Sequence, residues 1–176
     1  MNALLVVLAV LVVALAAAVV TLLVRRNRRP RRLPVNRGAR RVLVAFSGRL
    51  DSTVVDAAIR IARADDAVLV PAYLLVVPLR YAEDSPLRDE VEIAMPLLEA
   101  VEHAALRAGV PVDARIEKGR TLTHALKRLW EVERFDRIIA PAPTNGHGGF
   151  TEKELAWVLT HAPAETVVLK PMPTAA

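Results

Sequence analysis

The chain of 176 residues contains no cysteine. This absence excludes a disulfide framework, thiolate chemistry and metal sites built from cysteine ligands. The four histidines also stand far apart, without a second histidine at metal-ligand spacing. We therefore expect no metal site, and we expect His103, His124 and His161 to lie on helix surfaces or in turns. His147 differs because it falls in a glycine-rich stretch, where it could contact a ligand.

Acidic residues are missing from residues 25–41, which contain nine arginines. The whole chain has 24 Lys and Arg residues against 19 Asp and Glu residues, a formal charge of +5. Without the nine arginines, 15 basic residues stand against 19 acidic ones, so the rest of the chain carries a charge of −4. A domain that binds nucleic acid through phosphate contacts carries its basic residues on its own face. Nucleic acid is therefore not an expected partner.

A long apolar run opens the chain, and no Lys or Arg precedes it. Residues 3–24 contain a single polar side chain, that of Thr21. About 20 apolar residues suffice to cross a bilayer core as a helix, so we expect residues 1–24 to form a transmembrane anchor. The alternative is a cleaved signal peptide, which would have a positively charged start and a shorter apolar stretch of about 7–15 residues.

An arginine-rich segment follows the apolar run. Residues 25–32 read RRNRRPRR, and basic clusters of this kind stay on the cytoplasmic side of a membrane. We therefore expect a single-pass protein of the cell membrane with its C-terminal domain in the cytosol. The arginines can also bind anionic lipid. Pro30, Pro34 and Gly38 disfavour a helix, so residues 25–40 are expected to form a cytoplasmic linker.

The remaining chain alternates apolar runs typical of strands with amphipathic segments typical of helices. Strands are predicted at residues 42–46, 67–78, 110–117, 136–140 and 166–170, and helices at residues 52–64, 91–109, 121–134 and 151–161. Pro96 indicates either a kink or a later start of the second helix. Trp130 and Trp157 fall at apolar helix positions and are expected to pack against the core. The alternation predicts a doubly wound α/β domain over residues 41–171, followed by a tail at 172–176.

Two loops are expected to meet at one edge of this sheet: residues 47–52 after the first predicted strand and residues 141–149 after the fourth. Ligands of open α/β sheets bind beyond the carboxyl ends of the strands. Glycines allow close backbone approach there, and helix N-termini offer free N–H groups, so both loops favour a phosphate. The alternative is structural, with Gly48 turning the chain and Asp51 or Ser52 capping the first helix. The candidate ligand-binding residues are Ser47, Gly48, Asp51, Ser52, Gly146, His147, Gly148 and Gly149.

The domain resembles the universal stress protein family. The resemblance rests on VLVAFSG at residues 42–48, DRIIAPAP at 136–143, GHGGF at 146–150 and THAPAETVVLKP at 160–171. It implies a Rossmann-like α/β fold with a five-stranded parallel sheet of order 3-2-1-4-5 and helices on both faces. It also implies homodimerisation through the last strand and, in one branch of the family, ATP as a ligand.

The sequence departs from the ATP-binding branch at the positions that contact phosphate. Ser47 stands where that branch has the Asp of its V-A-x-D-G-S pattern, and Arg49 stands at the final Ser. Around the second loop, the glycines and serine of the branch are replaced by Pro141, Thr144, Glu152 and Lys153. Glu152 would place negative charge where a phosphate is expected. We therefore expect an ATP site that is degraded or lost.

The first loop also resembles a second motif. Residues 47–53, SGRLDST, are similar to the PP-loop of ATP pyrophosphatases, Ser-Gly-Gly-x-Asp-Ser, with Arg49 replacing the second glycine. This resemblance implies an ATP-using adenylating enzyme. The chain shows neither a second cluster of basic catalytic residues nor a substrate domain, and function is assigned by the site rather than the fold.

The sequence thus predicts a membrane-anchored regulatory or interaction module that is not an enzyme. Its expected partners are the membrane, a second copy of the chain and a neighbouring membrane protein. Tethering would raise the local concentration of the domain beside such a membrane protein. The alternatives are the adenylating enzyme and a purely structural module that dimerises and thereby pairs two anchors.

Overall fold

The computed structural model describes residues 39–143 and 149–170, and these residues form an alternating α/β domain. The predicted anchor at residues 1–24 lies outside the described residues, as do most of the linker and the predicted tail at 172–176. Within the described part, no helix is long and apolar enough to cross a membrane. In chain order the elements are β1 (Arg41–Phe46), α2 (Ser52–Ala64), β2 (Val68–Val76), α3 (Arg88–Arg107), β3 (Arg115–Gly119), α4 (Leu122–Val132), β4 (Arg137–Pro141), α5 (Glu152–His161) and β5 (Glu165–Leu169).

The five strands form one parallel sheet of order β3-β2-β1-β4-β5, which confirms the predicted topology. β1 is central and pairs with β2 from Arg41↔Val68 to Phe46↔Tyr73. On its other side β1 pairs with β4, where Val44 is opposite Ile139. Residues 42–46 are fully buried because strands on both sides and helices on both faces shield them from water.

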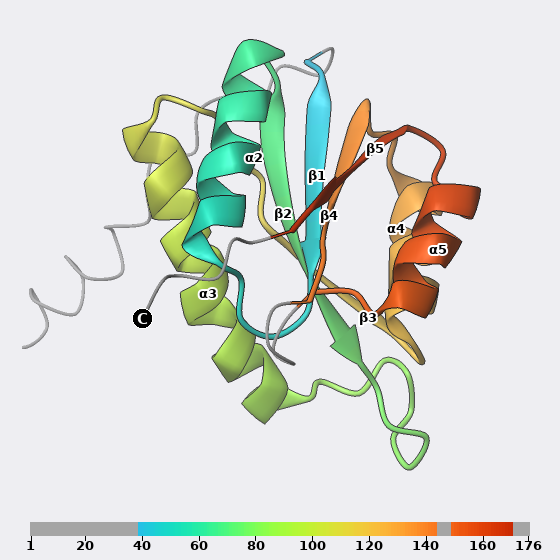
Figure 1. Ribbon diagram of the computed structural model, residues 1–176. Coiled ribbons are helices and arrows are strands. Elements are labelled where there is room, and N and C mark those ends of the chain that lie inside the picture. Colours follow the sequence, from blue (N-terminus) through green and yellow to red (C-terminus); the bar gives the residue numbers. More distant parts are fainter. Residues whose placement is uncertain (1–38, 144–148, 171–176) are drawn as a thin grey trace, which may run out of the picture. The chain divides into compact units, whose positions relative to one another are not determined.

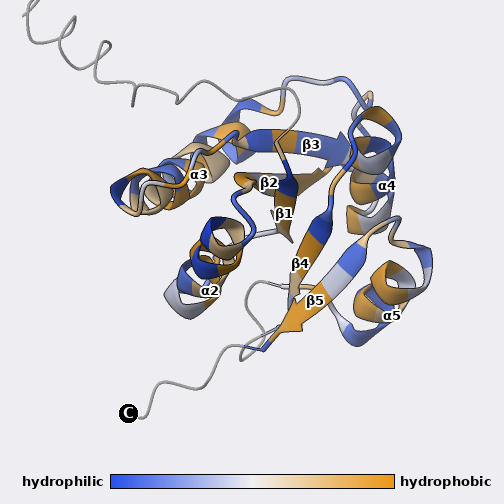
Figure 2. Cartoon of the chain, turned by 90° about the horizontal axis from the view of Figure 1, so that it is seen from above, coloured by the Kyte–Doolittle hydropathy of each residue, from blue (hydrophilic) through white to orange (hydrophobic). Residues whose placement is uncertain are grey.

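Helices cover the sheet on both faces, as Figures 1 and 2 show. α2 and α3 lie on one face, where Val42, Val44 and Leu69 pack against Ala58 and Val101. α4 and α5 lie on the other face (Figure 2). There the core contains apolar residues of β1, β2 and β4 packed with residues of both helices, among them Leu43, Val70, Ile138, Leu126, Leu129 and Val158.

The predicted boundaries of two elements were wrong. α3 starts at Arg88 rather than near residue 91, and Pro96 lies inside the helix, so the later start considered for Pro96 does not occur. The third strand runs from Arg115 to Gly119 rather than over residues 110–117, because it pairs with the distal half of β2. Of the earlier residues, Val112 forms an isolated bridge with Leu69.

Four charged side chains form a closed ring at the amino-terminal edge of the sheet. Arg41 lies 3.0 Å from Asp113 and 2.9 Å from Glu133, and Arg115 lies 2.9 Å and 2.7 Å from the same two carboxylates. The backbone N–H of Arg41 also donates to the carboxylate of Asp136 at 2.7 Å. The ring therefore joins the start of β1, the approach to β3 and the end of α4.

Candidate functional site

The candidate site lies at the carboxyl edge of the sheet, where the loops that follow β1 and β4 are neighbours. Because Val44 is opposite Ile139, continuing the parallel register places Phe46 level with Pro141. The next residues of the two strands, Ser47 and Ala142, therefore leave the sheet side by side. This is the edge at which open α/β sheets bind ligands.

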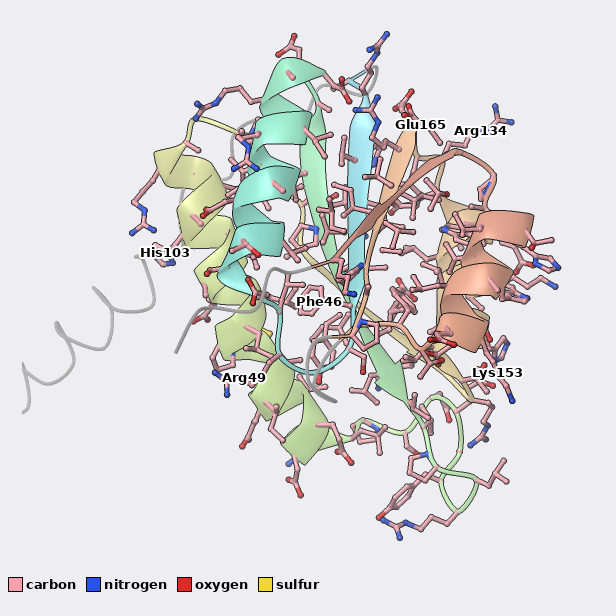
Figure 3. The ribbon with its side chains drawn as sticks, in the orientation of Figure 1. Phe46, Arg49, His103, Arg134, Lys153 and Glu165 are labelled. Atoms are coloured by element: carbon pink, nitrogen blue, oxygen red, sulfur yellow. The ribbon has the colours of Figure 1, made fainter. Side chains whose placement is uncertain are left out.

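The loop between β1 and α2 is built around one glycine and one helix cap. Gly48 has a φ of +72°, a left-handed conformation that glycine adopts without steric penalty. Ser47 and Gly48 are partly buried, whereas Arg49 and Ser52 are exposed (Figure 3 labels Arg49). Asp51 is the N-cap of α2, which confirms the structural interpretation of this residue.

Asp51 occupies most of the donor groups in the first turn of α2. Its carboxylate accepts from the backbone N–H of Thr53 at 2.8 Å and from the Thr53 hydroxyl at 2.6 Å. Its carbonyl oxygen accepts from the N–H groups of Val54 and Val55 at 3.1 and 3.2 Å. The hydrogen bonds from the Thr53 side chain and backbone hold the pKa of the Asp51 carboxyl below its usual value. A carboxylate thus fills the place where this helix would present N–H groups to an anion.

The loop between β4 and α5 begins and ends at the same point of the sheet. The N–H of Phe150 donates to the carbonyl of Pro141 at 2.9 Å, and Phe150 itself is buried in the core. Gly149 has a φ of +78°, and a Cβ there would lie 2.8 Å from the backbone of Ala142. Of the predicted site residues in this loop, Gly149 therefore has a clear packing role. Gly146, His147 and Gly148 lie outside the described residues.

The N-terminus of α5 is also capped by a carboxylate of the chain itself. Thr151 is the N-cap, and the carboxylate of Glu154 accepts from both its backbone N–H and its hydroxyl at 2.8 Å. The Thr151 hydroxyl oxygen in turn accepts from the N–H of Glu154, which completes a capping box. Sequence reasoning missed this motif, although Thr-x-x-Glu before an apolar helix is its signature. Together with Glu152, Glu154 makes this helix start negative.

A third loop, residues 77–87 between β2 and α3, completes this edge and was missed as part of the site. It extends beyond the sheet (Figure 1). Basic side chains on β3 and directly after it hold this loop. Arg120 Nη1 donates to the carbonyls of Pro78 at 2.9 Å, Tyr81 at 3.0 Å and Val77 at 3.3 Å. Lys118 Nζ donates to the carbonyl of Ser85 at 2.6 Å.

An apolar cluster joins this third loop to the first. Leu87, at the end of the loop, packs with Phe46, Tyr73 and Val77, and Leu50 from the β1–α2 loop packs against the same cluster. Phe46 and Tyr73 meet edge to face with their ring centroids 5.5 Å apart. The position of the third loop is thus coupled by contact to the residues around Ser47.

The tryptophans pack as predicted. Trp130 and Trp157 stack with ring centroids 5.5 Å apart, and both rest against the core beneath α4 and α5. The His161 ring stacks on Trp157 with ring centroids 4.8 Å apart. Among residues 39–143 and 149–170, no group of three or more His, Asp or Glu side chains is placed to hold a metal ion.

The topology and the position of these loops define a doubly wound α/β domain of the type that binds ligands at its carboxyl edge. Its fold is that of the universal stress proteins. The chain is similar to the universal stress protein from Archaeoglobus fulgidus, with a TM-score of 0.56, 14% identity, and coverage of 73% of this chain and 92% of that chain.

Two ligand-bound structures are similar to the same extent. A universal stress protein from Arabidopsis thaliana with AMP bound matches with a TM-score of 0.56 and 18% identity, over 76% of this chain and 93% of that chain. A universal stress protein in complex with cAMP matches with a TM-score of 0.55 and 20% identity, over 74% and 97%. No protein-family model matches the sequence. No curated protein is significantly similar to it.

Proposed function

We propose that this chain is a membrane-anchored, cytosol-facing regulatory or interaction module with the universal stress protein fold, and that it has lost nucleotide binding of the usual kind. The observation that carries the proposal is the double capping at the carboxyl edge. Asp51 caps α2 and Glu154 caps α5, so both helix starts that would receive a phosphate already hold a carboxylate.

The charges at both helix starts oppose the binding of a nucleotide phosphate. A helix N-terminus attracts anions through its free N–H groups and its partial positive charge. Here Glu152 and Glu154 neutralise that charge at α5, and Asp51 does so at α2. A nucleotide phosphate would have to displace a carboxylate or lie beside it, which is unfavourable at short range. Two proteins of similar fold are known with AMP and with cAMP bound, which supports a nucleotide ligand in those proteins, and the carboxylates at the helix starts support its loss here.

Calorimetry on the full chain in detergent micelles tests the proposal. ATP, ADP and AMP would be titrated separately, with and without magnesium, and we expect no saturable heat at ligand concentrations up to about 1 mM, which corresponds to a binding free energy weaker than about −4.1 kcal/mol. The matched variant is Glu152→Gln combined with Glu154→Gln, which keeps side-chain volume and removes both charges. Micromolar binding to the unaltered chain that Gly48→Val abolishes would contradict the proposal.

The anchor and partners belong to the same proposal. Residues 3–24 would span the membrane, residues 25–32 would keep the following domain in the cytosol, and tethering would raise its concentration beside membrane proteins.

β5 pairs only with β4 among the described strands, which leaves its other edge open to a second copy. Val168 on this strand is 38% exposed, which favours such contact. Crosslinking in membranes through Cys introduced at Thr166 would detect this dimer, with Glu102→Cys on α3 as the control.

The adenylating alternative receives no support from the first loop. The PP-loop resemblance would require the backbone around Gly48 and Arg49 to wrap a pyrophosphate. Asp51 instead caps α2 through Thr53. We therefore expect no ATP-dependent pyrophosphate release in the presence of carboxylate or amine substrates. Release that Asp51→Asn abolishes while the fold is kept would favour the enzyme.

A further inference from the structure

The Nδ1 atom of His124 lies between two partners and can bind only one of them at a time. His124 Nδ1 is 3.3 Å from the backbone nitrogen of Arg120, which donates to it, and 3.5 Å from the carboxylate of Glu83. His124 lies in the first turn of α4, and its own backbone N–H donates to the Thr121 hydroxyl. Glu83 belongs to the third loop, residues 77–87, at the rim of the candidate site.

The proton on Nδ1 decides which partner is bound. Without a proton, Nδ1 is an acceptor that satisfies the Arg120 N–H and opposes the lone pairs of the Glu83 carboxylate. With a proton, Nδ1 becomes a donor to Glu83 and can no longer accept from Arg120. Imidazole is the side chain that ordinarily changes charge between about pH 5 and 8.

We propose that His124 is a pH-sensitive clasp on the third loop. Uptake of a proton breaks the hydrogen bond from the Arg120 N–H to Nδ1 and forms an ion pair between the imidazolium and Glu83. The third loop is then held more tightly at acidic pH, and this regulation is independent of whether a nucleotide binds.

Charged groups from several elements surround the ring and set the strength of this exchange. Arg128 on α4 lies 3.1 Å from the same oxygen of Glu83, so the carboxylate already has one cation before His124 gains its charge. The side chains of His124 and Glu83 are 41% and 32% exposed, so solvent moderates both interactions. The remaining charged groups on the elements nearby are Arg80 and Asp84 in the third loop, Arg115, Glu117, Lys118 and Arg120 on or after β3, Lys127 and Glu131 on α4, and Glu152, Lys153 and Glu154 on α5.

The clasp acts on a segment that reaches the candidate site. The Arg120 guanidinium binds the carbonyls of Val77, Pro78 and Tyr81. A shift of the Arg120 backbone would therefore be transmitted to the start of the third loop. At the other end of this loop, Leu87 has a φ of +39°, a left-handed conformation that is strained for leucine, and is buried with Phe46. The loop thus links the His124 clasp to the residues that precede Ser47.

Nuclear magnetic resonance of the full chain in detergent micelles, with labelled histidine rings, tests the proposal. We expect Glu83→Gln, which keeps an acceptor for Arg128, to lower the pH at which the His124 ring takes up its proton by about half a unit. By reciprocity, protonation strengthens the contact with Glu83 by the same factor. His103 and His161 are internal controls, because their Nδ1 atoms face the carbonyls of Glu99 at 3.1 Å and Trp157 at 2.9 Å, and their titrations should not change.

The Arg120 amide gives the second readout. Its proton resonance should move upfield as the pH falls, with the same midpoint as the His124 ring, because the amide loses its acceptor. A purely structural histidine would titrate without that movement. The proposal requires both results: an unchanged midpoint in Glu83→Gln overturns it, and so does an Arg120 amide that keeps its hydrogen bond when the ring is charged.

Discussion

A Cβ atom on Gly149 would lie 2.7 Å from the carbonyl oxygen of Pro141, the same oxygen that accepts from the N–H of Phe150. This contact closes the loop between β4 and α5 directly on the end of the strand. Because Gly149 also has a left-handed φ, both the backbone conformation and the space at this position require glycine.

Gly149→Ala should therefore destabilise the domain more than a glycine substitution that is unfavourable for only one of these two reasons. Gly109 is the matched control, since its φ of +74° is similar and a Cβ there meets nothing within 4 Å. We expect Gly109→Ala to cost about 1–2 kcal/mol from the left-handed backbone, and Gly149→Ala to cost about 1–3 kcal/mol more from the clash. Melting followed by tryptophan fluorescence measures both, and equal losses would show that the backbone at Gly149 moves freely.

Asp51→Ala should remove the cap of α2, at about 1 kcal/mol, while Asp51→Asn should keep most of it because asparagine is an equally good N-cap. The pKa of Asp51 is lowered in the folded state. The charge of its carboxylate therefore stabilises the fold at pH values above the ordinary pKa of about 4. That contribution is lost as the pH falls through the folded value. The stability difference between the unaltered chain and Asp51→Ala should accordingly shrink on acidification, and a pH-independent difference would contradict the role of the charge.

Glu117→Gln should stabilise the domain at neutral pH. Burial against α4 raises the pKa of the Glu117 carboxyl, although the charges of Arg128 and Arg115 oppose the shift. The folded state then holds the proton more tightly than the unfolded state, so the favourable contribution exists below about pH 4 and is lost as the pH rises through the raised value. We expect a gain below about 1 kcal/mol at pH 7, because this side chain is only half-buried, and no gain near pH 3.

Exposed glutamate on α4 supplies the control for that experiment. Glu131 is 61% exposed and lies 3.9 Å from Lys127, so Glu131→Gln should leave the pH profile of stability nearly unchanged. A Glu117→Gln variant that is less stable than the unaltered chain at pH 7 would mean that attraction to the two arginines outweighs the burial of the charge.

Deleting residues 1–24 should leave a folded and soluble domain. The buried apolar core of the described chain extends from Val42 to Val158, and the deletion removes none of these residues. The deletion also removes the long apolar run. Circular dichroism and a cooperative melt of the truncated protein measure this, and an insoluble or unfolded product would contradict the division into anchor, linker and domain.

Local sequence patterns were sufficient for the elements whose signals are local. β1 and α2 were predicted to within one residue, because a short apolar run, a Ser-Gly turn and helical spacing follow one another without interruption. The strand order, in contrast, followed from the resemblance to universal stress proteins and not from periodicity. Structural comparison supports that order at 14–20% identity, a level at which fold is retained and residue roles are not transferred.

The misplaced elements and the missed residues depend on contacts between distant parts of the chain. The alternation at residues 110–117 resembles a strand, but pairing with Ala72 to Val76 of β2 selects residues 115–119. The start of α3 depends on Leu87, which tertiary burial holds in a left-handed conformation. The third loop is attached through hydrogen bonds from Arg120 to carbonyls 39 to 43 residues earlier in the chain. No local sequence motif predicts these hydrogen bonds.

The ring of ion pairs at Arg41 has a mechanical consequence. β1 begins at this residue, so a pull on the start of the strand acts on the side chain that holds Asp113 and Glu133 together. β1 runs between β2 and β4, so a pull directed along this strand would load its bonds to both neighbours in shear. Such a load would be shared by these bonds instead of breaking them one at a time, so β1 would resist a pull in that direction.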